Sequence, residues 1–257
     1  YRILKKLRIK WITSERNDPN NFAGKRITKI CYQYLLTKAD GVVFQTSQAK
    51  NYYKGRIRGY EKIIYNPLDL TKFPDSVSGM KRNVIINVGR LHPQKNQKLL
   101  IKAFKSIYER HPDYKLEIYG EGELRATLQT QIDSLDLSSV VKLMGSRADV
   151  LDCVKSGNIF VLTSNFEGMP NALIEAMALG IPVISTDCPC GGPRELIRDH
   201  KNGTLVPIED ENNLVSAIEE LIISSELREQ YSKEEVKIKE LLNMDKIMSE
   251  WEGMIKE

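Results

Sequence analysis

The sequence has little of what membrane-spanning, disulfide-bonded or metal-dependent proteins need. No apolar run approaches the roughly 18 residues of a membrane span, and the charged start at 1–6 lacks the apolar stretch of a signal peptide. The four cysteines include only one close pair, at 188–190, which is too tight for a zinc knuckle. We therefore predict reduced thiols, no metal, no cofactor and a cytoplasmic location. Because the chain begins with Tyr1 and not Met, we expect a longer parent protein.

Charge is distributed unevenly along the chain. Residues 1–75 hold 16 Lys and Arg against 6 Asp and Glu, whereas the remaining residues hold 22 against 28. A basic segment on a near-neutral body favours an anionic partner such as a membrane surface, although a solvated basic face explains the counts equally well. Nucleic acid is disfavoured, because aromatic and basic residues do not interleave as they do in RNA-binding proteins.

From residue 83 onward, short apolar runs alternate with segments of helical periodicity. The predicted strands are 84–88, 115–119, 140–144, 159–163, 182–185 and 203–206. The predicted helices are 97–108, 123–135, 149–156, one that carries Glu175, a short one near Arg194, and 212–223. This alternation is typical of a parallel sheet covered by helices on both faces. The sequence therefore predicts an α/β, Rossmann-like domain, which binds ligands beyond the carboxyl ends of its strands.

The rest of the chain forms two further parts. In the first, strands are predicted at 9–13, 41–45 and 62–65, and helices at 25–37 and from 48. These are too few strands for a complete Rossmann-like half. The tail is charged and helical, with a last amphipathic segment at 244–255. We expect an incomplete domain at 1–75, a complete domain at 76–225 and carboxyl-terminal helices at 226–257.

Polar residues follow two of the predicted strands. After the first come Gly89, Arg90 and Lys95. The glycine permits close backbone approach and the cations suit phosphate oxygens, although two solvated loop cations would look the same. After the second comes G-x-G-x-x-R at 120–125. It lacks the third glycine of the dinucleotide fingerprint, and a tight turn explains it, so a nicotinamide dehydrogenase is disfavoured.

The run E-G-M-P-N-A-L-I-E at 167–175 follows the fourth strand and places two carboxylates around a helix start. Pro170 suits the first turn of that helix, so the next three N–H groups, of Asn171, Ala172 and Leu173, would face an anion. If a diphosphate binds there, Glu175 can accept hydrogen bonds from a ribose and Glu167 can contact a sugar on the distal phosphate. The alternative is a helix acid that interacts with the dipole and an unrelated loop acid.

Taken together, these segments resemble the retaining family 4 glycosyltransferases, which have the two-domain GT-B fold. The run from 167 to 184 is similar to their E-x7-E signature. Further similar segments are V-G-R-L with Lys95, Y-G-E-G at 119–122, M-G at 144–145, L-T-S at 162–164 and N-G-T-L-V at 202–206. The resemblance covers about 62–224. It is weaker over 1–61, where only S-E-R-N at 14–17 and Q-T-S at 45–47 resemble the end of the family's amino-terminal domain.

The resemblance implies roles for the matching residues. Arg90 and Lys95 match cations that contact the donor diphosphate, Glu175 matches a ribose-binding acid, and Glu167 matches an acid that contacts the transferred sugar. Glu167, Arg90 and Lys95 are therefore the candidate catalytic residues. The implied donor-binding set is Gly89, Arg90, Lys95, Gly145, Arg147, Glu167, Gly168, Met169, Pro170, Asn171, Ala172, Leu173 and Glu175, with Gly145 to Arg147 beside the nucleobase. The chain has no Asp-x-Asp motif, which agrees with metal-independent binding in which the cations and the helix dipole replace the ion.

The resemblance also implies an activity. It is the retaining transfer of a hexose or N-acetylhexosamine from a UDP-sugar to a saccharide acceptor. The run C-P-C-G-G-P-R-E at 188–195 is similar to a variant in bacterial enzymes that extend lipid-linked surface polysaccharides, so we expect a lipid-linked acceptor at the inner face of the cell membrane. Retention in this family is usually described as same-face substitution assisted by a diphosphate oxygen, so we name no general base.

The front of the chain departs from the family. The glycine-rich first loop, several strands and an acceptor-side His are absent, so 1–75 match only the end of the acceptor-side domain. We therefore expect this chain to bind donor without transferring its sugar. Two alternatives remain: a nucleotide-sugar binding module without transfer activity, and a GT-B-shaped epimerase, for which we find no acid/base set.

Overall fold

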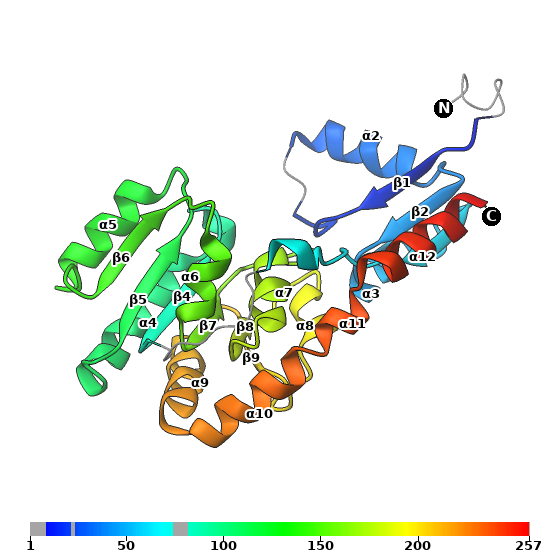
Figure 1. Ribbon diagram of the computed structural model, residues 1–257. Coiled ribbons are helices and arrows are strands. Elements are labelled where there is room, and N and C mark those ends of the chain that lie inside the picture. Colours follow the sequence, from blue (N-terminus) through cyan, green and yellow to red (C-terminus); the bar gives the residue numbers. More distant parts are fainter. Residues whose placement is uncertain (1–8, 22–23, 74–81, 257) are drawn as a thin grey trace.

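The computed structural model describes residues 9–21, 24–73 and 82–256, which form two parallel sheets joined by carboxyl-terminal helices (Figure 1). The charged start at 1–6 and the boundary predicted at 75/76 lie outside the described residues. The α/β class predicted from the alternating pattern is confirmed.

The larger sheet has six strands in the order β6-β5-β4-β7-β8-β9, all paired in parallel. Its strands are β4 (Val84–Val88), β5 (Lys115–Tyr119), β6 (Val141–Gly145), β7 (Ile159–Leu162), β8 (Val183–Thr186) and β9 (Thr204–Val206). Each predicted strand is present within one or two residues of its predicted bounds. The strand order reverses between β4 and β7, and the loops that leave two such strands diverge and open a crevice for ligands.

Helices cover both faces of this sheet. They are α4 (Gln97–Arg110), α5 (Arg125–Ser134), α6 (Val150–Ser156), α7 (Asn171–Ala178), α8 (Gly192–Leu196) and α9 (Glu211–Ile223). Alternate residues of β4 point to opposite faces. Ile85 packs with α4, α5 and α9, whereas Ile86 packs with α6 and α7. Because both faces are covered, the strands carry continuous apolar runs, which is why they were recognisable in the sequence.

The smaller sheet has three parallel strands in the order β1-β2-β3. They are β1 (Ile12–Glu15), β2 (Gly41–Phe44) and β3 (Tyr60–Ile63), with α2 (Arg26–Leu36) and α3 (Ser47–Tyr52) between them. The strand predicted at 9–13 was misplaced, since pairing with β2 begins only at Ile12 opposite Gly41. Ile9 and Lys10 are exposed, so the apolar pattern at 9–13 did not mark the paired residues.

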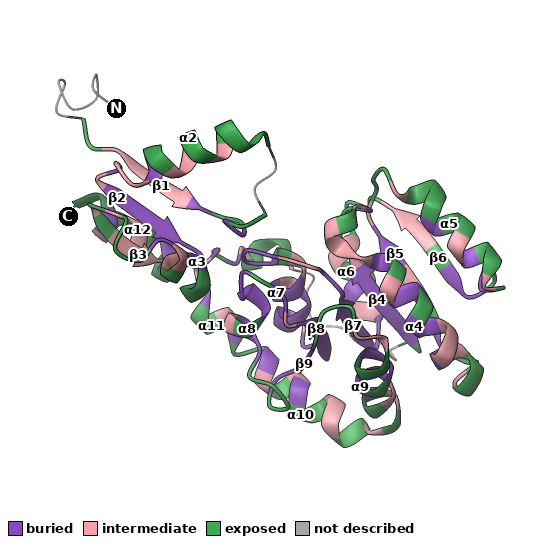
Figure 2. Cartoon of the chain, turned by 180° about the vertical axis from the view of Figure 1, so that it is seen from behind, coloured by how far each residue is buried: buried purple, intermediate pink, exposed green. Residues whose placement is uncertain are grey.

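The carboxyl-terminal helices connect the two sheets. They are α10 (Ser225–Glu235), α11 (Ile238–Leu241) and α12 (Met244–Lys256). Tyr231 and Ile238 pack into the cores of the larger half, whereas Ile247 and Met254 of α12 pack against Val43 of the smaller sheet. Figure 2 shows the buried strand β2 lying beside α12. The amphipathic segment predicted at 244–255 is therefore confirmed as a helix, and it covers one face of the smaller sheet.

Candidate active site

The loops that follow β4 and β7 meet at the point where the strand order reverses. Lys95 ends a short 3₁₀ turn, Pro93–Lys95, in the first loop, and Glu167 lies in the second. The two loops are hydrogen-bonded to each other: Thr163 Oγ1 donates to the Lys95 carbonyl at 3.0 Å, and the Asn165 N–H donates to the Gln94 carbonyl at 2.8 Å. Residues 68 positions or more apart in the chain are thus held in one rigid cluster.

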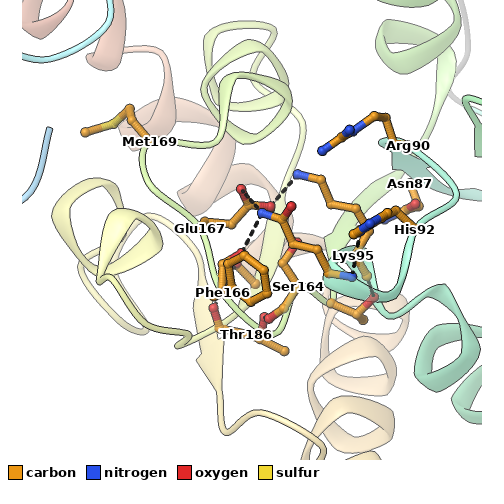
Figure 3. A network of polar contacts seen from close by, with 12 residues as sticks. Asn87, Arg90, His92, Lys95, Ser164, Phe166, Glu167, Met169 and Thr186 are labelled. Carbon is orange, nitrogen blue, oxygen red and sulfur yellow. Dashed lines mark hydrogen bonds and ion pairs between the residues drawn. The ribbon is translucent and has the colours of Figure 1, made fainter. Parts of the chain in front are cut away.

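Lys95 and Glu167 form a buried ion pair at the centre of this cluster (Figure 3). Their side chains are 17% and 8% exposed. Ser164 Oγ donates a further hydrogen bond of 2.6 Å to Glu167 Oε1, and Gln94 Nε2 lies 3.5 Å from Oε2. A desolvated pair with these extra hydrogen bonds has a well-defined geometry. The pairing was not predicted from the sequence, which assigned Lys95 to a diphosphate and Glu167 to a sugar.

Arg90 supplies an unpaired cation beside this pair. Its carbonyl accepts hydrogen bonds from the His92 N–H and from Gln97 Nε2, both at 2.9 Å. Its exposed guanidinium makes no hydrogen bond or ion pair within the part of the chain that the structure describes. Figure 3 shows the Arg90 and Lys95 side chains extending in the same direction, toward Glu167. The positive charge of Arg90 is therefore available to an anionic ligand.

Helix α7 begins directly after the loop that carries Glu167. The sequence suggested that Pro170 lies in the first turn of this helix, but Pro170 directly precedes it. No side chain caps the helix start. The Leu173 N–H is also unavailable, because it donates to the Pro170 carbonyl at 3.1 Å. The N–H groups of Asn171 and Ala172 donate to no described residue. Two backbone donors, not three, are thus left for an anion at the positive end of the helix dipole.

Glu175 lines a cavity of about 170 Å³ on the next turn of α7. The other residues around it are Pro67, Leu68, Asp69, Lys72, Phe73, Leu151, Asn171 and Ile174. The carboxylate of Glu175 makes no hydrogen bond or ion pair with any described residue. Burial raises the pKa of its carboxyl group, and the charge of Lys72 acts in the opposite direction. A half-buried carboxylate without a partner is well placed to accept hydrogen bonds from a ligand's hydroxyl groups.

A second cavity, of about 230 Å³, lies beside the start of α6. It is lined by Val88, Gly89, Arg90, Tyr119, Gly120, Glu121, Ser146, Arg147 and Val150. Val150 lines this cavity, and its sequence neighbour Leu151 lines the cavity of Glu175, so the two cavities are adjacent. The Arg147 guanidinium is held by Asp149 through hydrogen bonds of 2.8 and 2.6 Å. Gly145 ends β6 just before this cavity, with a φ of 75°.

The G-x-G run belongs to the wall of the second cavity. A Cβ on Gly120 would lie 2.1 Å from the Gly89 carbonyl, and one on Gly122 would lie 2.4 Å from the Leu91 carbonyl. Both glycines therefore allow the loops after β4 and β5 to pack closely. The Arg125 N–H donates to the Gly122 carbonyl at 3.1 Å and α5 begins at Arg125, so the prediction of a tight turn into a helix is confirmed.

The structure thus gathers Arg90, Lys95, Glu167 and the start of α7 at one edge of the sheet, with Glu175 in an adjoining cavity. Met169 and Leu173 are different, because their side chains are buried in the core of the larger half. Sequence reasoning missed four residues near these groups. Ser164 and Gln94 contact Glu167, Asn66 contacts Asn171, and Lys72 lines the cavity of Glu175. Asn66 follows β3, and a polar residue at a strand's carboxyl end is a signal that could have identified it.

Within the described ranges, no group of three or more His, Cys, Asp or Glu side chains could hold a metal ion. No helix there is long and apolar enough to cross a membrane.

A family model described as group 1 glycosyl transferases matches residues 70–237. Among solved structures, Anabaena HepE in complex with UDP has a TM-score of 0.88 at 21% identity, over 98% of this chain and 74% of that one. Staphylococcus aureus TarM has a TM-score of 0.86 at 22% identity, over 97% of this chain and 51% of that one. The family model and these structural similarities show the GT-B fold of glycosyltransferases, so the fold predicted from the sequence is confirmed.

Curated relatives agree with the family model. An uncharacterized glycosyltransferase of Methanocaldococcus jannaschii is 31% identical over 96% of this chain and 71% of its own length. A diphospho-undecaprenol 4-alpha-N-acetylgalactosaminyltransferase of Campylobacter jejuni is 30% identical over 82% of this chain, which spans 58% of that protein. The chain belongs to the group 1 glycosyl transferases.

Proposed function

We propose that this chain binds a UDP-sugar, and that its parent transfers a hexose or N-acetylhexosamine from it, with retention of configuration, as family 4 enzymes do. The observation that carries the proposal is the set of groups at the start of α7. There, the helix start has two free backbone N–H groups, and the buried Lys95–Glu167 pair lies in the loops beside it. Asn171 lines the cavity of Glu175, and the unpaired Arg90 lines the second cavity. Cations and free backbone donors at a helix start suit a diphosphate.

Each part of the donor then has a complementary partner. The diphosphate lies on the start of α7, within reach of Arg90 and Lys95. The ribose enters the cavity of Glu175, where the carboxylate accepts its hydroxyl hydrogen bonds, and the nucleobase occupies the adjoining cavity beside Gly89 and Arg147. The sugar extends toward Glu167. No metal is required in this arrangement, because the cations and the helix dipole neutralise the leaving diphosphate.

The ion pair gives Lys95 a second role in this proposal. Its ammonium has three donors, of which Glu167 uses one. Lys95 can therefore bind a diphosphate oxygen without releasing Glu167, and it would fix the carboxylate next to the sugar. A carboxylate beside an anionic ligand is tolerated here because the lysine charge lies between them.

A lipid-linked saccharide is the proposed acceptor. The support is the name of the Campylobacter relative, together with that of an Escherichia coli galactosyltransferase acting on a diphosphoundecaprenol-linked sugar, 34% identical over 61% of this chain. The acceptor needs the opposing half of the cleft, which contributes only three strands in the described residues. Because holding both reactants together is worth roughly 7–11 kcal/mol, we propose that this chain alone binds donor but does not transfer it.

The test is isothermal calorimetry of the chain with UDP, uridine and UDP-sugars, combined with a transfer assay on the chain and its longer parent. We expect saturable UDP binding by both proteins and transfer only by the parent. The alternative of a binding module without transfer activity predicts binding by both and transfer by neither. Absence of UDP binding to either protein would refute the proposal.

A further inference from the structure

The residues that follow the three strands of the smaller sheet lie against the loop that precedes α7. β1, β2 and β3 end at Glu15, Phe44 and Ile63. Soon after these ends come Arg16, Gln45 and Asn66. A Cβ placed on Gly168 would lie 2.2 Å from the Arg16 carbonyl and 3.3 Å from the Gln45 side chain. The loop that carries Glu167 is therefore in direct contact with the other half of the molecule.

Asn66 connects this contact to the first residue of α7. Its Oδ1 accepts a hydrogen bond of 2.6 Å from Arg16 Nη2, and its Nδ2 donates to Asn171 Oδ1 at 2.7 Å. The same Nδ2 lies 3.5 Å from the Met169 carbonyl. Asn66 is 8% exposed, so both ends of a buried amide have partners and its orientation is fixed.

This arrangement solves a conflict at the start of α7. A side-chain cap normally fixes a helix start by accepting a hydrogen bond from one of its first N–H groups, but that would remove a donor that an anion needs. Helix α7 has no such cap. Asn66 binds the side chain of Asn171 instead, so it holds the first turn in place and leaves the backbone donors free.

We infer that Asn66 is a positioning residue for the donor diphosphate, supplied by the opposite half of the molecule and acting through Asn171. The inference rests on the proposed function, because it needs a diphosphate at the start of α7. It adds a residue outside the donor-binding half to the determinants of donor affinity. Arg16 has a supporting role, since its hydrogen bond orients the Asn66 amide so that Nδ2 faces Asn171.

The effect of losing this contact should be specific to the phosphate part of the ligand. In Asn66→Ala the first turn of α7 is free to shift, and we expect UDP to bind about tenfold more weakly, equivalent to about 1.4 kcal/mol. Uridine has no phosphate, so its affinity should change by less than about twofold, a difference of under 0.5 kcal/mol. A general loss of structure would weaken the binding of both UDP and uridine.

Tyr65→Phe is the matched control. Tyr65 is the sequence neighbour of Asn66, and its hydroxyl donates to Glu195 Oε2 at 2.9 Å, which also joins the two halves but does not touch α7. Removing this hydroxyl tests whether the loss of any contact between the two halves weakens donor binding. We expect UDP affinity to remain unchanged in this variant.

The deciding experiment is a double-mutant cycle on the whole chain, using Asn66→Ala, Asn171→Ala and both together, with UDP affinity from calorimetry and uridine affinity from ligand-detected NMR. If Asn66 acts through Asn171, Asn66→Ala alone weakens UDP binding about tenfold. In the Asn171→Ala background the same substitution should cause no further loss of UDP affinity. Asn171 is exposed, so its variant should fold even if the Asn66 variant does not, and it should show the same loss by itself.

Three results would overturn the inference while the wild-type chain still binds UDP. They are an Asn66→Ala affinity within twofold of wild type, additive losses in the double variant, or an equal loss in Tyr65→Phe. If the wild-type chain binds no UDP at all, the proposed function fails and the positioning role fails with it. The two failures are therefore distinguishable.

Discussion

The two halves of the molecule are built by different means. The six-stranded half takes the helices on its two faces mostly from segments between its own strands. The three-stranded half has α12 on one face, which follows β3 by some 180 residues of chain. The side chains that bond to its central ion pair, Ser164 and Gln94, also come from the larger half. The contacts between the halves, such as Asn66 to Asn171, instead adjust the position of a ligand-binding segment. We expect changes inside the larger half to affect stability most, and changes across the boundary to affect binding.

The largest expected effect concerns the ion pair inside the larger half. Lys95→Ala leaves the buried Glu167 carboxylate without its counter-charge, and removing one partner of such a pair typically costs 3–5 kcal/mol. Urea denaturation should show a loss of about 3 kcal/mol for this variant. The double variant Lys95→Met with Glu167→Gln is the control and should regain most of the stability. A loss below about 0.5 kcal/mol, the usual range for surface changes, would mean that the pair is solvated.

Glu175→Ala should separate binding from stability. UDP affinity is expected to fall by roughly 1.5–3 kcal/mol, the usual range for hydrogen bonds to a charged group. Stability should not fall, because the carboxylate makes no hydrogen bond or ion pair with a described residue, so its removal leaves no group unpaired. Calorimetry with UDP and urea denaturation of both proteins give the two readouts. Unchanged UDP affinity would disprove the ribose assignment.

The same residue predicts a pH dependence. Burial raises the pKa of Glu175 in the folded chain above its ordinary value of 4.5. The folded state therefore binds more protons than the unfolded state between the two pKa values, and stability falls as pH rises through that window. Glu175→Gln removes this penalty, so it should be more stable than wild type at pH 7 and lose that advantage as pH falls below the unfolded pKa. An advantage that persists unchanged at low pH would contradict the role of burial.

Glu167→Ala should distinguish UDP from the intact donor. The substitution frees Lys95 for the diphosphate, so UDP affinity is expected to stay the same or increase. A UDP-sugar should bind more weakly, by about 1–3 kcal/mol for the lost hydrogen bonds to the sugar. Competition calorimetry with both ligands measures the difference. Equal losses for UDP and UDP-sugar would show that Glu167 does not face the sugar.

The smallest effect concerns the basic front of the chain. Helix α2 exposes Ile27, Ile30 and Tyr34 beside the exposed cations Lys25 and Arg26. A cation near an acidic lipid surface contributes about 1 kcal/mol, so the chain should float with acidic liposomes more than with neutral ones. Arg26→Gln should reduce that preference. Equal partition into both kinds of liposome would mean that this charge is merely solvated.

Much of the larger half could be predicted because its signals are local. Strands buried on both faces appear as apolar runs, and Arg90, Lys95, Glu167 and Glu175 follow strand ends or lie one helical turn further on. These positions follow from the rule that parallel sheets bind ligands at their carboxyl edge.

The rest depends on contacts between distant segments, which have no local signature. Nothing in the sequence indicates that Asn66 meets Asn171, that Lys72 lies near Glu175, or that α12 packs on the smaller sheet. The start of β1 was misplaced for a related reason, because an edge strand has one neighbour and its bounds are set by pairing with β2.

The most direct test of the account compares UDP binding by the wild-type chain and by Arg90→Ala. The Arg90 guanidinium has no partner among the described residues, so the substitution should change stability by less than about 0.5 kcal/mol. Calorimetry should show one UDP site in the wild type and a loss of about 1.5–3 kcal/mol in the variant, because a hydrogen bond to charged phosphate is removed. Binding that is absent in the wild type, or equal in both proteins, would contradict the assignment of a donor diphosphate to this edge of the sheet.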